Sequence, residues 1–98
     1  MINVIGVIPA RLGSTRLSEK VLRPIAGRPM IQHVWERAKR AKKLKELIVA
    51  CDHPRVESCV RGFGGTVMMT RADHPNGSSR VAEVASLKNA DYFINIQG

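Results

Sequence analysis

Aromatic residues are scarce in this sequence, and the four present are Trp35, Phe63, Tyr92 and Phe93. None of them is interleaved with the basic residues that give the chain its formal net charge of +8. Proteins that bind single-stranded nucleic acid stack bases on aromatic side chains inside a positively charged groove. The sequence lacks such a stacking platform, so we expect no nucleic-acid partner, although the charge alone would permit one.

Long hydrophobic runs and metal-binding cysteine motifs are also missing. No apolar run approaches the ~18 residues of a membrane-spanning helix, and Met1-Ile2-Asn3 lacks the basic opening of a secretory signal. The only cysteines, Cys51 and Cys59, do not have a spacing such as C-x-x-C. We therefore expect a cytoplasmic protein without a membrane partner, and two buried free thiols.

Two common phosphate-binding motifs, G-x-x-x-x-G-K-[ST] and G-x-G-x-x-G, are absent as well. What the chain has instead is a basic loop that follows the apolar run Val4–Ile8, a run typical of a buried strand. The loop carries Arg11, Arg16 and Lys20 among small residues. Such a loop beyond the carboxyl end of a strand suits a polyphosphate. From composition alone, an ordinary solvated basic loop stays an open alternative.

Apolar runs and amphipathic stripes alternate along the chain. They predict strands at 4–8, 47–51, 66–69 and 91–98. The helices between them are predicted from apolar positions at helical spacing: Ile31, Val34, Trp35, Ala38 and Ala41, then Val56, Cys59, Val60 and Phe63, then Val81, Val84, Ala85 and Leu87. Pro29 suits the first position of the first helix, after a short connection at 21–28. Asp52 is the predicted cap of the second helix.

The resulting order, βαβαβαβ, predicts one α/β domain with a parallel sheet and right-handed crossovers. Its expected strand order is 3-2-1-4, which puts the loop at Arg11 and the segment Gln97-Gly98 beside the same crevice. The fourth strand would then be an open edge of the sheet. We therefore expect the chain to be cut within a larger fold.

Five segments together carry a specific resemblance, and they are IPARLGSTRLSEK, AGRPMIQHVWERA, VACDHPRV, GGTVMMTRADHPNGSSRVAEVA and FINIQG. In this order they resemble the 3-deoxy-manno-octulosonate cytidylyltransferases, also called CMP-KDO synthetases, over nearly the whole chain. The resemblance implies a three-layer, Rossmann-like nucleotide-diphospho-sugar transferase fold. Residues 1–98 would be the N-terminal nucleotide-binding part of that domain, truncated after the fourth strand.

The resemblance also implies an activity, the transfer of a cytidylyl group from CTP to 3-deoxy-D-manno-octulosonate (KDO). The products would be CMP-KDO and pyrophosphate, for lipopolysaccharide biosynthesis. Enzymes of the family are cytoplasmic, use Mg²⁺ and usually form homodimers. We expect this chain by itself to be an incomplete, inactive fragment. Two alternatives stay open: another sugar-nucleotide or cofactor nucleotidyltransferase, and a non-catalytic basic remnant that binds nucleic acid.

Site residues follow from the resemblance position by position. Arg11 and Lys20 match the catalytic residues that bind the triphosphate. The remaining matches are substrate-binding positions, namely Ala10, Ser14, Arg16, Gly77, Ser78, Arg80, Gln97 and Gly98. The family's magnesium-binding aspartate would come directly after Gly98, so we assign no metal ligand within this sequence.

Overall fold

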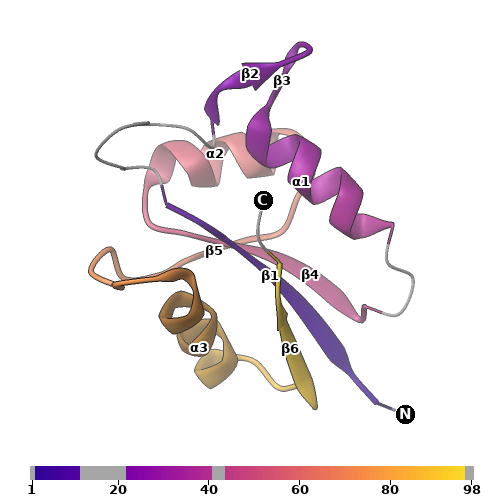
Figure 1. Ribbon diagram of the computed structural model, residues 1–98, viewed down its shortest axis with the longest axis vertical. Coiled ribbons are helices and arrows are strands. Elements are labelled where there is room, and N and C mark those ends of the chain that lie inside the picture. The colour runs from indigo at the N-terminus through magenta and orange to yellow at the C-terminus, as the bar shows by residue number, and fades with distance from the viewer. Residues whose placement is uncertain (1, 12–21, 41–43, 97–98) are drawn as a thin grey trace.

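The computed structural model describes residues 2–11, 22–40 and 44–96, and the structural statements below concern these residues. Its centre is a sheet of four parallel strands (Figure 1). These strands are β1 (Val4–Ala10), β4 (Glu46–Cys51), β5 (Val67–Met69) and β6 (Tyr92–Asn95). Their spatial order is β5-β4-β1-β6, which confirms the predicted α/β class and the predicted order of strands.

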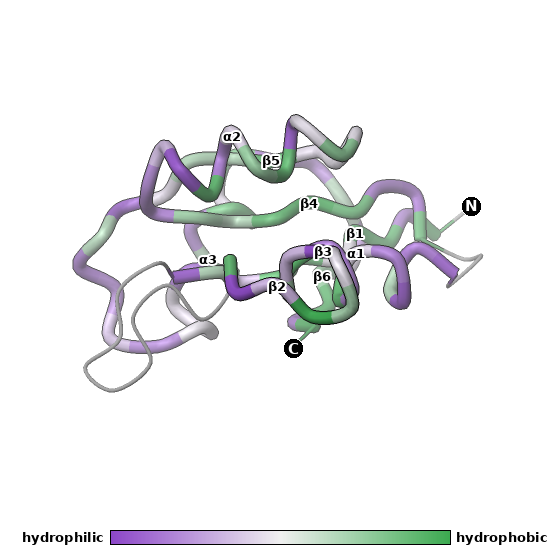
Figure 2. The backbone as a smooth tube through the Cα atoms, turned by 90° about the horizontal axis from the view of Figure 1, so that it is seen from above, coloured by the Kyte–Doolittle hydropathy of each residue, from purple (hydrophilic) through white to green (hydrophobic). Residues whose placement is uncertain are grey.

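The two central strands are buried on both faces, as expected for a parallel sheet covered by helices. In β1, Ile5 and Val7 belong to the core on one face of the sheet, whereas Ile8 and Ala10 belong to the core on the other. Figure 2 shows β4 as hydrophobic over most of its length, after Glu46 at its start, while α2 (Pro54–Gly62) alternates between hydrophobic and hydrophilic residues. The difference fits a strand enclosed on two sides and a helix with one solvated side.

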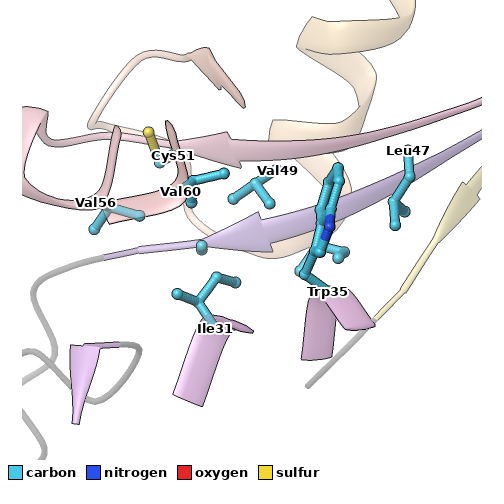
Figure 3. Close-up of a cluster of buried hydrophobic side chains, with 9 residues drawn as sticks. Ile31, Trp35, Leu47, Val49, Cys51, Val56 and Val60 are labelled. Atoms are coloured by element: carbon cyan, nitrogen blue, oxygen red, sulfur yellow. The ribbon is translucent and has the colours of Figure 1, made fainter. Parts of the chain in front are cut away.

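The larger core lies between the sheet and two helices, α1 (Met30–Lys39) and α2. Its nine buried side chains, drawn in Figure 3, are Ile8, Ala10, Ile31, Trp35, Leu47, Val49, Cys51, Val56 and Val60. Trp35 of α1 also meets Phe63, with ring centroids 6.2 Å apart and a tilt of 55°. Val34 and Ala38 are partly buried against this core, so the predicted stripe of the first helix is confirmed up to Ala38; Ala41 lies outside the described residues.

The smaller core lies on the other face, beneath α3 (Gly77–Leu87). It contains Ile5, Val7, Ile48, Ala50, Val81 and Val84. Figure 1 shows α3 well apart from α1 and α2, and the sheet runs between the two groups. Leu87 does not join this core, since 63% of its surface is exposed. The helix begins at Gly77, ahead of Val81, the first apolar position of the stripe predicted for it.

The short connection before the first helix contains a hairpin that the sequence pattern did not predict. Strands β2 (Pro24–Ile25) and β3 (Arg28–Pro29) pair antiparallel around Ala26 and Gly27. These two turn residues have φ of 53° and 82°, the left-handed values that a tight two-residue hairpin turn requires. The helix therefore begins at Met30, and Pro29 is its N-cap instead of its first helical residue.

The cap of α2 also differs from the prediction. The ring nitrogen Nδ1 of His53 accepts a hydrogen bond from the backbone N–H of Arg55 at 3.1 Å, so His53 is the N-cap. Pro54 follows at the first helical position, where a proline fits because no backbone N–H is needed there. Asp52 lies near a buried arginine of α3 instead, a long-range contact that a local pattern cannot reveal.

Two expectations from the sequence concern membrane-spanning helices and the cysteines. None of the helices in the described ranges is long and apolar enough to cross a membrane. Both cysteines are free thiols; Cys51 is fully buried and Cys59 is partly buried. Burial raises the pKa of both thiols, which disfavours the reactive thiolate.

Candidate functional site

A cavity of about 240 Å³ opens at the carboxyl end of β1, next to the start of α3. It is lined by Pro9, Arg11, His74, Pro75, Asn76, Gly77 and Arg80. The carboxyl edge of a parallel sheet is where α/β proteins bind their ligands. The cavity brings together three of the predicted site residues, Arg11, Gly77 and Arg80, from two distant segments of the chain.

The other predicted site residues divide into two groups. Ala10 is the buried last residue of β1, and Ser78 is an exposed residue in the first turn of α3; both neighbour residues that line the cavity. Those that lie outside the described residues are Ser14, Arg16, Lys20, Gln97 and Gly98. Their predicted roles, and the crevice expected between the basic loop and Gln97, therefore stay predictions.

The first turn of α3 is shaped by Asn76, which the sequence analysis did not single out. The Asn76 side chain accepts a hydrogen bond from the backbone N–H of Ser79 at 2.8 Å, and the Ser79 hydroxyl donates to the Asn76 carbonyl at 2.9 Å. An asparagine just before a helix is a common N-cap, so this signal was available in the sequence. The capped end points its positive dipole toward the cavity that Asn76 and Gly77 line.

Arg80 is almost fully buried, with 2% of its surface exposed. Its Nη1 donates hydrogen bonds to the Thr70 hydroxyl at 2.6 Å and to the Arg71 carbonyl at 2.8 Å. Its Nη2 lies 3.8 Å from Oδ2 of Asp52. Thr70 in turn donates to the Cys51 carbonyl from its backbone at 2.7 Å and from its hydroxyl at 2.8 Å. Arg80 therefore ties the carboxyl ends of β4 and β5 to α3.

A second cluster holds the loop in front of α3. The carboxylate Oε1 of Glu83 accepts the backbone N–H of Arg71 at 2.9 Å and faces Nε2 of His74 at 2.6 Å. Both hydrogen bonds lower the pKa of Glu83, and the one from the backbone of Arg71 has the larger effect. Neither Glu83 nor His74 was predicted as a site residue, because contacts between a loop and a helix leave no periodic signal in the sequence.

The aspartates of the described segments do not form a magnesium site. Asp52 faces Arg80, Asp73 is paired with Arg71 at 2.7 Å, and Asp91 accepts the backbone N–H of Asn3 at 2.7 Å. The hydrogen bond from Arg71 lowers the pKa of Asp73. Across these segments no group of three or more His, Cys, Asp or Glu residues is arranged to hold a metal ion. These carboxylates therefore do not fit Mg²⁺, which takes oxygen ligands in octahedral geometry.

The chemistry of the cavity is that of an anion-binding and orienting site. Arg11 is exposed at its rim, Arg80 forms part of its wall, and the N-terminus of α3 adds a positive dipole. All three favour a ligand with negative charge, and guanidinium groups suit phosphate oxygens in particular. The cavity is smaller than the ~300 Å³ at which most ligand pockets begin, so a larger ligand would extend beyond it.

Comparison with known proteins gives consistent results. The 3-deoxy-manno-octulosonate cytidylyltransferase of Geobacter sulfurreducens is 51% identical over 96 residues, which are 98% of this chain and 38% of the relative. The enzyme of the same name from Escherichia coli is 53% identical over 92 residues, 94% of this chain and 37% of the relative. An 8-amino-3,8-dideoxy-manno-octulosonate cytidylyltransferase of Shewanella sp. is 50% identical over an alignment of 99 positions, which covers 98% of this chain and 40% of the relative.

A solved structure agrees with these relatives. The structure of a CMP:2-keto-3-deoxy-manno-octonic acid synthetase complexed with CTP matches with a TM-score of 0.95 and 50% identity. The match covers 97% of this chain and 39% of that one. The chain thus spans less than half the length of the proteins it resembles. The family model described as Cytidylyltransferase matches residues 5–98, and we conclude that the chain belongs to the cytidylyltransferase family.

Proposed function

We propose that the chain is the N-terminal nucleotide-binding part of an enzyme that transfers a cytidylyl group from CTP to KDO, releasing CMP-KDO and pyrophosphate. The names of relatives about half identical to it support this acceptor, and the CTP complex of a structurally similar synthetase supports the nucleotide. The observation that carries the proposal is the cavity that joins Arg11 to the start of α3 at the carboxyl edge of the sheet.

The proposed reaction is an in-line attack of the sugar's anomeric hydroxyl on the α-phosphate of CTP. Phosphoryl-type transfer needs little covalent help from the protein and depends on positioning and on charge stabilisation. Arg11, exposed at the end of β1, would bind the β- and γ-phosphates together with Lys20 and stabilise the charge that develops on pyrophosphate. Arg80 would hold the α3 side of the cavity in place through its buried hydrogen bonds.

Further properties of the complete enzyme belong to the same proposal. They are a magnesium cofactor, a homodimeric assembly, a cytoplasmic location and a role in lipopolysaccharide biosynthesis, all implied by the resemblance. When bound, magnesium would polarise the phosphate oxygens of CTP. The described carboxylates do not fit this ion, so we assign none of them to it.

The sugar that receives the cytidylyl group has a second candidate. The Shewanella relative is named for an 8-amino sugar and is 50% identical to this chain, close to the 51% of the Geobacter sulfurreducens relative named for KDO. The two sugars differ at one position, where an amine replaces a hydroxyl. Any test of the function should therefore offer both acceptors.

A chimera tests the proposal in an enzyme of full length. Residues 1–98 would replace the matching part of the Geobacter sulfurreducens relative, and pyrophosphate release would be measured with CTP, magnesium and either sugar. We expect turnover with KDO, because half of the matched residues are already identical. Residues 1–98 alone should show none. A folded chimera that turns over neither sugar would contradict the proposal.

The isolated chain can be tested by CTP titration. Arg11→Ala and Lys20→Ala should each weaken CTP binding by about 1.5–3 kcal/mol, the range for hydrogen bonds to charged groups. Arg61→Ala is the matched control, because Arg61 is an exposed residue of α2 paired only weakly with Glu57 at 3.4 Å. Superimposable titration curves for the wild type and both loop variants would refute the assignment.

A further inference from the structure

The contact between His74 and Glu83 fixes where the imidazole of His74 carries its proton. The pKa of Glu83 is lowered by hydrogen bonds from the Arg71 N–H and from His74, so its carboxylate is ionised at neutral pH. An ionised carboxylate only accepts hydrogen bonds. Nε2 of His74, 2.6 Å from Oε1 of Glu83, must therefore be the donor. In a neutral imidazole the other nitrogen, Nδ1, is then an acceptor.

Nδ1 of His74 is open to a ligand. Within residues 2–11, 22–40 and 44–96 it makes no hydrogen bond, since the one polar contact of the ring is that of Nε2 with Glu83. In the same segments, every buried side-chain nitrogen or oxygen has a hydrogen-bond partner. An unbonded Nδ1 must therefore be accessible. The side chain is 14% exposed, and it forms part of the wall of the cavity between Arg11 and Arg80.

This acceptor differs from its charged neighbours in the cavity. Arg11 and Arg80 bring only hydrogen-bond donors, which attract phosphate oxygens. The side-chain oxygen of Asn76 is already engaged by the N–H of Ser79 at 2.8 Å. Among the described side chains that line the cavity, His74 is thus the one with a free acceptor, and it suits a part of the ligand that carries a polar hydrogen.

We propose that His74, oriented by Glu83, is a specificity-determining residue that accepts a hydrogen bond from an N–H or O–H group of the bound nucleotide. Glu83 is the positioning residue, because it acts through the imidazole and does not line the cavity. The inference rests on the proposed function in one respect, namely that the ligand is CTP. Three groups of CTP provide such a hydrogen: the amino group of cytosine, which uracil replaces by a carbonyl oxygen, and the 2′- and 3′-hydroxyls of the ribose.

Binding titrations with CTP, UTP, 2′-deoxy-CTP and 3′-deoxy-CTP separate these three sources. We expect the wild-type chain to prefer CTP by about tenfold over the nucleotide that lacks the donor, the value of one net hydrogen bond. His74→Phe keeps the ring but removes the acceptor, and it should reduce that preference to about one. Loss of the preference over UTP identifies the base amine, and loss of the preference over 2′-deoxy-CTP or 3′-deoxy-CTP identifies the 2′- or the 3′-hydroxyl. His33→Phe is the control, because His33 lies outside the cavity and bonds the Ile25 carbonyl.

Variants of Glu83 test its positioning role. Glu83→Gln keeps an oxygen that can accept both hydrogen bonds, so it should keep the preference, whereas Glu83→Ala should lose it. The ¹⁵N shifts of the imidazole, read by NMR, should show a proton on Nε2 in the wild type and a mixture of tautomers in Glu83→Ala.

The outcomes distinguish this inference from the proposed function. If the wild type binds CTP but His74→Phe keeps all its preferences, or if NMR places the proton on Nδ1, the role of His74 is refuted and the proposed function stands. If the wild type binds none of the four nucleotides, the proposed function fails and this inference fails with it.

Discussion

The buried guanidinium of Arg80 allows a quantitative test of how the candidate site is held together. Arg80→Met keeps a similar length of side chain but removes the donors to the Thr70 hydroxyl and the Arg71 carbonyl. It also leaves Asp52, whose side chain is 10% exposed, without its cationic neighbour at 3.8 Å. Removing one partner from a buried charged cluster costs about 3–5 kcal/mol. We expect the lower value, about 3 kcal/mol, because the distance to Asp52 is long.

Such a loss is large for a domain of this size, whose free energy of unfolding is about 5–15 kcal/mol. It corresponds to a decrease in Tm of about 12–24 °C. Urea unfolding followed by far-ultraviolet circular dichroism would measure it. Arg61→Met is the matched control, and its change should stay within about 0.5 kcal/mol, because Arg61 is 65% exposed.

A double variant separates the charge from the packing. Asp52→Asn removes the carboxylate that Arg80 neutralises, so the combination with Arg80→Met should cost less than the sum of the two single changes. If the free energy of unfolding of Arg80→Met lies within about 1 kcal/mol of the wild-type value, the reasoning is refuted. The guanidinium would then contribute no more to stability than a solvated side chain does.

Two further predictions concern the segment in front of α3. Asn76→Ala removes the cap from Ser79 and should lower the free energy of unfolding by about 1 kcal/mol in urea, whereas Asn76→Asp should change it little; equal losses in both would contradict the cap. The pKa of Glu83 is lowered in the folded state, so its stabilising contribution is present above its unfolded pKa of about 4.3 and is lost as the pH falls through the folded value. The decline of Tm below about pH 4.5 should therefore be shallower in Glu83→Gln, and an unchanged slope would count against this role.

The strands and helices were predictable because they depend on patterns spread over many residues, and the order of the strands then followed from rules of topology. Four apolar runs separated by amphipathic helices permit few arrangements of a parallel sheet. The contrast between the faces of β1, with Val7 in one core and Ile8 in the other, follows from the alternation of side chains along a strand.

The hairpin of β2 and β3 could not be predicted in the same way. Each strand has two residues, too few for any periodicity, so the sequence predicted only a short connection at 21–28. The turn also places Ala26 at φ 53°, a conformation for which the sequence gives no signal because alanine rarely adopts it. His33 and Glu36 of α1 contact the hairpin at Ile25 and Arg28, and the short sequence of the hairpin itself gives no signal of these contacts.

The sequence identified residues of the candidate site but not how they are arranged. Arg11 and Arg80 were selected from the sequence, and the structure brings both to one cavity. The burial of Arg80 and its contact with Asp52 were not visible, since they depend on how α3 packs against the ends of β4 and β5. The structure places Asp52 beside Arg80, and His53, the residue directly before α2, is the cap of that helix.

The sheet that separates the two cores also determines what a fluorescence experiment can detect. The sole indole of the sequence, Trp35, is 7% exposed and belongs to the core beneath α1 and α2, whereas α3 packs on the opposite face. Its emission should report the loosening of α1 from the sheet and stay silent if α3 alone detaches. A local opening of the wall that carries His74 would thus escape tryptophan emission and require a reporter placed on α3.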